Sequence, residues 1–218
     1  MPDTNRFSTN VFFSFLIYLI FNLMSANTFS QTLLREYYEN DSVKSEGELA
    51  NDKKIGAWKF YYPNGALTSI ENYKDDQLHG LSIYYDAEGN LIAEERWEKG
   101  LQNDSSIYYY PNGRIEKEGV FKEGLYEGLW LFFYEDGTIK REGQYERGLP
   151  HGEWNFYNKN GNLIQKGRFK NGMETGEWKF YSDKGFMEYS GNYKNGDKTG
   201  IWYRYTKSGI QHVFEEYQ

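Results

Sequence analysis

The sequence predicts an all-β fold: an elongated antiparallel single-sheet array of stacked β-hairpins. Aromatic residues recur at fixed positions every 24 residues, and no segment between them has the 3.6-residue periodicity or the length of a helix. Glycine keeps the same period, at Gly65, Gly89, Gly113, Gly137, Gly161, Gly185 and Gly209. A fixed period of this length is typical of stacked supersecondary units, each of which contacts only its neighbours.

Each 24-residue repeat is predicted to be one hairpin. Repeats 1 to 7 begin, at position 0, with residues 56, 80, 104, 128, 152, 176 and 200. The turn glycine stands at position 9, and a second glycine-centred turn falls near position 20, so fourteen strands are expected. Position 5 is always Tyr or Phe, and position 17 is always aromatic. Position 2 is Ser in repeats 2 and 3 and otherwise tryptophan, at Trp58, Trp130, Trp154, Trp178 and Trp202.

The turn also predicts which side chains face each other. A turn centred between positions 8 and 9 pairs position 2 with position 15 and position 4 with position 13. Because side chains alternate across a strand, positions 2, 4, 11, 15 and 17 should share one aromatic face. Trp58 and Trp202 would face glutamate and are expected to deviate. The other indoles would lie across a paired glycine, as in aromatic rescue, at Trp130/Gly143, Trp154/Gly167 and Trp178/Gly191.

The termini differ from the repeats. Residues 31–55 are predicted to be a degenerate repeat that caps the N-terminal edge, before the seven repeats of residues 56–218. At the other end, the strand around Trp202 to Tyr205 is expected to be an unpaired edge. Residues 1–30 contain Arg6 followed by a 14-residue apolar run, Val11 to Met24. That run predicts a signal peptide, with an uncleaved anchor as the alternative, and hence a protein that is exported: periplasmic, exposed at the cell surface or secreted.

Composition excludes several classes of function. The net charge is −7, and a basic footprint for nucleic acid is lacking. The same charge disfavours binding to anionic phospholipid. The chain has no cysteine, so disulfides and thiol chemistry are excluded. Histidines and carboxylates are scattered along the array, so we predict no catalytic residues, no metal site, no cofactor and no enzymatic activity.

The predicted function is therefore binding, with another protein as the expected partner. The position 5 tyrosines are expected to lie in a row on the more polar face, and tyrosine is favoured in binding surfaces. The candidate contact residues are Tyr85, Tyr109, Tyr157 and Tyr181. Two alternatives stay open: binding of a cell-wall glycan or other carbohydrate through the aromatic ladder, and membrane association.

The repeat pattern resembles a known family. The segment from Gly176 to Gly196 follows the pattern G-x-W-x-F-Y-x-x-x-G-x-L-x-x-x-G-x-Y-x-x-G, apart from Met187 at the leucine position. The pattern resembles the MORN repeat, and more closely the bacterial MORN-repeat variant family. The resemblance covers about residues 47–218 and implies a hairpin array. It also implies a scaffolding or antitoxin-like binding role, because many members of that family are exported or carry an antitoxin label. The period of 24 departs from the more usual 23.

Overall fold

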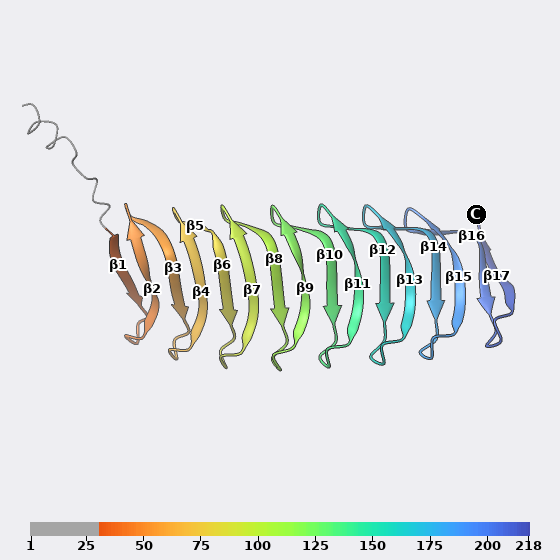
Figure 1. Cartoon of the computed structure of the whole chain (residues 1–218), viewed down its shortest axis with the longest axis horizontal. Coiled ribbons are helices and arrows are strands. Elements are labelled where there is room, and N and C mark those ends of the chain that lie inside the picture. Colours follow the sequence, from red (N-terminus) through yellow and green to blue (C-terminus); the bar gives the residue numbers. More distant parts are fainter. Residues whose placement is uncertain (1–30) are drawn as a thin grey trace, which may run out of the picture.

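The computed structural model describes residues 31–218, which form one 17-stranded antiparallel sheet. The strands follow one another in chain order in a long row of hairpins (Figure 1). The described residues contain no helix. The strands are β1 (Gln31–Tyr37), β2 (Val43–Ala50), β3 (Lys53–Tyr61), β4 (Leu67–Lys74), β5 (Gln77–Leu78), β6 (Gly80–Tyr85), β7 (Leu91–Glu98), β8 (Leu101–Tyr109), β9 (Ile115–Lys122), β10 (Leu125–Phe133), β11 (Ile139–Glu146), β12 (Leu149–Tyr157), β13 (Leu163–Lys170), β14 (Met173–Tyr181), β15 (Met187–Lys194), β16 (Asp197–Tyr205) and β17 (Gln211–Tyr217).

The two kinds of turn explain the two rows of glycine. At position 9 the glycine has a positive φ, for example 85° at Gly65, and its N–H donates to the carbonyl at position 6. In the second turn both central residues, at positions 19 and 20, have a positive φ, as a two-residue type I′ hairpin requires. Asp75 and Asp76 occupy this turn in repeat 1 without glycine, with φ values of 52° and 67°.

The strand count exceeds the fourteen expected. Segment 31–50 contributes the hairpin β1/β2, and the short strand β5 is separated from β6. The predicted C-terminal edge was wrong. The strand around Trp202, β16, is paired on both sides, and the edge of the sheet is β17. The reason is that repeat 7 still has its second strand, from Gln211 to Tyr217.

The predicted pairing of residues within each hairpin is confirmed. The indole, however, does not cover the glycine of its own hairpin; it covers the glycine of the preceding repeat. Trp154 is paired with Gly167 in its own hairpin and with Gly143 of the preceding repeat. Its ring lies over Gly143, where an added Cβ would overlap the indole. Trp58 and Trp202, expected to deviate, cover glycine in the same way. The covered glycines are Gly47, Gly119, Gly143, Gly167 and Gly191.

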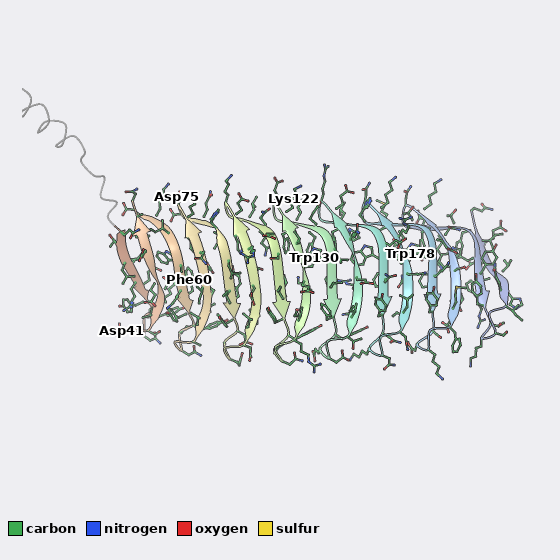
Figure 2. All side chains as sticks on the ribbon, in the orientation of Figure 1. Asp41, Phe60, Asp75, Lys122, Trp130 and Trp178 are labelled. Atoms are coloured by element: carbon green, nitrogen blue, oxygen red, sulfur yellow. The ribbon has the colours of Figure 1, made fainter. Side chains whose placement is uncertain are left out.

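This arrangement makes each tryptophan a link between repeats. The indole N–H of Trp154 donates to the carbonyl of Gln144 in the preceding repeat at 3.1 Å. The five position 2 tryptophans are at most 3% exposed and form most of the buried apolar core (Figure 2 shows Trp130 and Trp178 in the sheet). Where Ser82 and Ser106 replace tryptophan, the preceding position 15 is Glu71 and Glu95 instead of glycine. A glycine at position 15 is therefore followed by a tryptophan at position 2 of the next repeat, and a glutamate at position 15 is followed by a serine.

The predicted faces need one correction. A register shift between positions 4 and 5 pairs Tyr157 with Leu163, that is, position 5 with position 11. Directly paired residues share a face, so position 11 lies with the tyrosines and not with the tryptophans. The physical reason is a β-bulge, which places one extra residue in the second strand.

At position 0 the backbone lies in the left-handed region, which glycine adopts without strain. Position 0 has a positive φ in every repeat, and in repeat 3 it is Asp104, with φ 79°. A non-glycine residue in this region costs about 1 kcal/mol or more. We therefore expect Asp104→Gly to raise the free energy of unfolding by about 1 kcal/mol, measured by urea denaturation. Asp104→Ala should give no such gain, because alanine retains the Cβ. A gain from both substitutions would show that loss of the carboxylate, and not the backbone, is responsible.

Candidate binding surfaces

Two surfaces result from the register. The tryptophan face carries positions 2, 4, 13, 15, 17 and 22, and the tyrosine face carries positions 1, 3, 5, 11, 14, 16, 18 and 21. The assignment follows from direct cross-strand pairs, such as Phe156 with Gln165 and Tyr126 with Phe121. Both faces hold apolar groups, so the tyrosine face is less polar than the sequence suggested.

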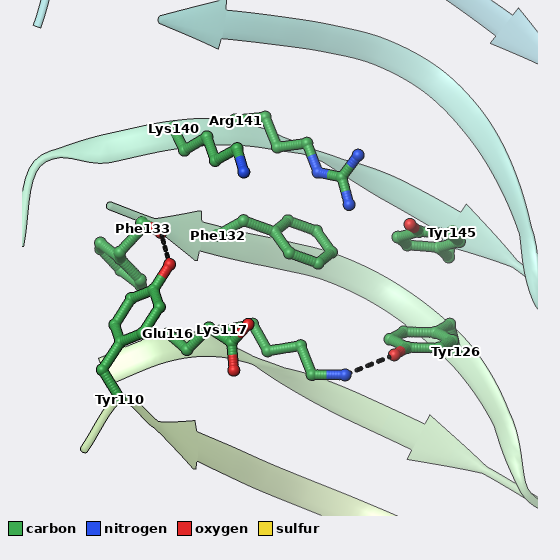
Figure 3. Close-up of a pocket in the computed structure, with 9 residues that line it drawn as sticks. All are labelled: Tyr110, Glu116, Lys117, Tyr126, Phe132, Phe133, Lys140, Arg141 and Tyr145. Carbon is green, nitrogen blue, oxygen red and sulfur yellow. Dashed lines mark hydrogen bonds between the residues drawn. The ribbon is translucent and has the colours of Figure 1, made fainter. Parts of the chain in front are cut away.

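Cationic side chains lie over the rings of the tryptophan face. The Nζ of Lys117 lies 4.1 Å from the centroid of the Tyr108 ring, and the guanidinium carbon of Arg141 lies 4.1 Å from that of Phe132. Lys117 also donates to the hydroxyl of Tyr126 at 3.0 Å. Lys117, Tyr126, Phe132 and Arg141 are among the residues that line a shallow pocket of about 320 Å³ (Figure 3). Arginine or lysine over an aromatic ring is attracted by the ring quadrupole, which makes this face an alternation of aromatic and cationic groups.

The indoles themselves are not available for stacking on a ligand. Trp58 and Trp130 are fully buried, and Trp154, Trp178 and Trp202 are 1–3% exposed. Neighbouring rings cover them edge-on, for example Phe169 against Trp178 with centroids 5.1 Å apart. The regular tryptophans therefore hold repeats together, as their fixed spacing suggested.

The candidate tyrosines lie in a row on the tyrosine face, each half-buried. Two of them bond to the preceding repeat: the hydroxyl of Tyr109 donates to Glu94 at 2.8 Å, and that of Tyr157 donates to Glu142 at 2.7 Å. The hydroxyls of Tyr85 and Tyr181 form no hydrogen bond within residues 31–218, because their preceding position 14 is Ile70 or Lys166. The row thus has a structural part, which sequence reasoning missed, and a part free for contact.

The bonded tyrosines predict a pH dependence of stability. Burial, and then the hydrogen bond to a glutamate, raise the pKa of Tyr109 and Tyr157 from 10.0 to about 12. A pKa raised by folding contributes stability that is complete below pH 10 and is lost as the pH rises through 12. We expect the urea midpoint to fall between pH 10 and pH 12. The double variant Tyr109→Phe/Tyr157→Phe should show a smaller fall, whereas an equal fall would assign the effect to other groups.

A row of exposed aliphatic side chains lies on the tyrosine face, at the opposite end of the strands from the position 5 tyrosines: in β12, for example, Leu149 is the first residue and Tyr157 the last. Position 21 of four successive repeats is about half exposed, and each leucine packs against the turn glycine of the next repeat. The row consists of Leu101, Leu125, Leu149 and Met173. At two strands per repeat it spans roughly 30 Å. Leu129 and Val120 extend the exposed apolar area on the same face, at 56% and 41% exposed. This row was not predicted from the sequence, although leucine recurs there at a 24-residue spacing, which was a usable signal.

Among known protein families, the sequence model of the family described as MORN repeat variant matches this chain. It matches five consecutive segments: residues 54–75, 78–99, 105–123, 126–147 and 150–171. The chain belongs to the MORN repeat variant family. Each matched segment corresponds to about one repeat, so the matches have the period found in the sequence and in the sheet. No curated protein sequence matches this MORN array.

Solved structures resemble the MORN array only distantly. A porin-like protein from Bacteroides uniformis ATCC 8492 is 12% identical with a TM-score of 0.20, over 85% of this chain and 94% of that one. The TcdB2-TccC3-Cdc42 structure is 12% identical with a TM-score of 0.17, over 85% of this chain and 14% of that chain. A protein of unknown function from Bacteroides fragilis NCTC 9343 is 8% identical with a TM-score of 0.13, over 87% and 91%. At these TM-scores none of them informs the function.

The described part of the MORN array, residues 31–218, contains neither a metal-binding cluster nor a membrane-spanning helix. That part of the chain has no group of three or more His, Asp or Glu side chains placed to hold a metal ion. It also has no helix that is long and apolar enough to cross a membrane. The predicted signal peptide, residues 1–30, lies outside the described residues. The MORN repeats form a repeat scaffold, and its surfaces are the features from which a function can be inferred.

Proposed function

We propose that this chain is a non-enzymatic MORN scaffold that binds another protein at the bacterial envelope or outside the cell. The observation that supports this proposal is the row of half-exposed aliphatic side chains, Leu101 to Met173, on the same face of the sheet as the tyrosines. Exposed apolar surface of this kind is typical of protein contact sites, and the tyrosines at the other end of the same face add contact area at low entropic cost.

The same surface favours protein over the other partners. Sugar rings stack on exposed aromatic faces, but the five position 2 indoles are buried and the exposed row is aliphatic. Anionic phospholipid would meet a chain with a net charge of −7. The predicted signal peptide supports an exported location, and the antitoxin label of the family would apply here if the partner were a toxin of the envelope.

The test is in-cell crosslinking of the tagged chain in the envelope fraction, followed by mass spectrometry. We expect one enriched protein, whose capture falls at least tenfold with the double variant Leu125→Asp/Leu149→Asp. Ile210→Asp is the matched control, since Ile210 is 58% exposed but lies in the last hairpin turn. Retention of the tag on purified cell wall or on lipid, without an enriched protein, would contradict the proposal.

A second comparison tests the tyrosines as anchors. Alanine at Tyr85 and Tyr181 should weaken capture of the partner with little effect on stability, because neither hydroxyl is bonded within the described residues. Alanine at Tyr109 and Tyr157 should lower both, since these hydroxyls bond to Glu94 and Glu142. If capture is unchanged with alanine at all four positions, the anchor assignment is wrong.

A further inference from the structure

Cations cover the position 4 rings of the first repeats in a series with one gap. Lys54 lies 4.9 Å from the centroid of Phe60, Lys117 lies 4.1 Å from Tyr108, and Arg141 lies 4.1 Å from Phe132. Tyr84, between Phe60 and Tyr108, has no lysine or arginine over its ring in the described part of the chain. Later rings without a cation pack against the next indole, as Phe156 does with Trp178 and Phe180 with Trp202.

Small residues explain the gap. Lys117 is the cross-strand partner of Tyr108, and the equivalent partner of Tyr84 is Ala93. On its other side Tyr84 is paired with Ser69. The following position 2, which would bring an indole against the ring, is Ser106. Tyr84 therefore lacks both kinds of cover that the other rings have.

Two carboxylates lie on either side of this gap. Glu95 is directly opposite Ser82, and the pairing of Ile70 with Ile83 places Glu71 next to Ser82 on the other side. Glu71 accepts hydrogen bonds from Ser69 and Tyr73, and Glu95 accepts one from Tyr108. Neither carboxylate forms an ion pair with another residue of segment 31–218. Burial raises the pKa of Tyr84, and the charges of Glu71 and Glu95 raise it further, while Ser82 and Trp97 beside its hydroxyl act in the opposite direction. The net shift is upward, in keeping with the two negative charges nearby.

Buried polar atoms without partners are found at the same place. Ser82 is fully buried and its Oγ has no hydrogen-bond partner, and the same holds for Ser106 Oγ, in a residue that is 1% exposed. The buried indole N–H of Trp97, on the same face, also makes no hydrogen bond of ordinary geometry, although it and Ser82 lie close enough to the Tyr84 hydroxyl to lower its pKa. Three further buried atoms of this kind lie elsewhere in the described residues, at Arg141, His151 and Trp178. An unsatisfied buried polar group is costly, so groups of this kind at one place indicate a function beyond packing.

We propose that the Tyr84 site, consisting of Tyr84, Ser82, Trp97, Glu71 and Glu95, binds a lysine or arginine side chain of the partner protein. This inference rests on the proposed function, because it takes the ligand from a protein. The guest cation would lie over the Tyr84 ring as Lys117 lies over Tyr108, and would bring positive charge to two part-buried carboxylates. The chain's own lysines and arginine show which chemistry this face accepts.

The direct test is a titration of the full ¹⁵N-labelled chain with Nα-acetyl-lysine methylamide, followed by NMR. The reporter is the indole N–H signal of Trp97, identified with Trp97→Phe. We expect a saturable shift at millimolar concentration. The norleucine analogue, which keeps the four-carbon side chain but lacks the ammonium group, should cause none. An equal response to norleucine would overturn the proposal, and so would stronger binding of tetramethylammonium, which would indicate a choline headgroup.

The sequence offers a variant that fills the site from within. Ala93→Lys should place an ammonium over Tyr84 and abolish the response to the probe. Gln165→Lys is the matched control: it adds the same charge at the same repeat position, opposite Phe156, which already packs against an indole. It should leave binding unchanged. Glu95→Gln should weaken binding at least about fivefold, in keeping with loss of a charge-assisted contact.

The results separate this inference from the proposed function. If the chain captures a partner but the Trp97 signal does not respond to the probe, the cation site is wrong and protein binding stands. If the probe binds and Ala93→Lys blocks it, but no partner is captured in cells, the cation site is supported and the proposal of a protein partner fails. If Ala93→Lys and Gln165→Lys have the same effect, the response is due to net charge, and the site is refuted.

Discussion

Replacing Gly143 with alanine is expected to lower the free energy of unfolding by about 3 kcal/mol. Its φ is not in the positive region, so backbone preference alone would favour alanine. The loss comes from the indole of Trp154, which lies where the new Cβ would be. The ring must move, and with it the hydrogen bond from its Nε1 to the carbonyl of Gln144.

A turn glycine provides the control for this substitution. Gly113 has a φ of 79°, and no atom lies within 4 Å of an added Cβ. Gly113→Ala should therefore cost only about 1 kcal/mol, from backbone strain. Urea denaturation followed by tryptophan fluorescence measures both values, and hydrogen exchange locates the loss at strands β11 and β12. Equal losses at the two glycines would mean that the indole adapts freely.

The second large effect is expected at the tryptophan itself. Trp154→Ser should cost about 4 kcal/mol, because it removes a 2% exposed indole and leaves a cavity over Gly143. Repeats 1 and 2 show a different solution, in which Glu71 precedes Ser82. The double variant Gly143→Glu/Trp154→Ser copies that solution. Arg141 and Tyr145 then take the places of Ser69 and Tyr73 beside the new carboxylate.

A double-mutant cycle measures the match. Gly143→Glu alone should be at least as damaging as Gly143→Ala, because the longer side chain meets the same indole. The double variant should be more stable than the sum of the single losses predicts, by about 2 kcal/mol. Denaturation of all four proteins at one pH gives this coupling. Strict additivity would show that the Gly–Trp and Glu–Ser pairs occur together without interacting.

Much of this fold could be predicted from the period alone. The turn at positions 7–10 fixes the register, and the pairs Trp154/Gly167 and Phe156/Gln165 occur as expected. Two features could not be predicted by pairing within one hairpin. The β-bulge adds a residue that moves position 11 to the other face. The indole has a glycine on each side, and only the stagger between repeats decides that it covers the preceding one.

The surfaces were less predictable than the fold. The tyrosine row could be predicted, but not that Tyr109 and Tyr157 bond to a neighbouring repeat, because that contact needs residues 15 apart in sequence to be adjacent in space. The gap over Tyr84 was hidden for a similar reason. It depends on the absence of a cation or an indole from three neighbouring strands. In the sequence, Ser82 and Ser106 appeared only as departures from the repeat pattern.

The matching of Gly with Trp and of Glu with Ser also restricts how the array can change its length in evolution. Repeat 2, residues 80–103, has Ser82 at position 2 and Glu95 at position 15. Either duplication or deletion of this segment therefore leaves a Glu–Ser pair at every new junction. Repeats 1 and 3 behave as adaptors, because each accepts one kind of neighbour and presents the other. Loss of repeat 3 would bring Glu95 against Trp130. Recombination can therefore lengthen or shorten this ribbon freely within either type of repeat, but must keep both adaptors as a pair.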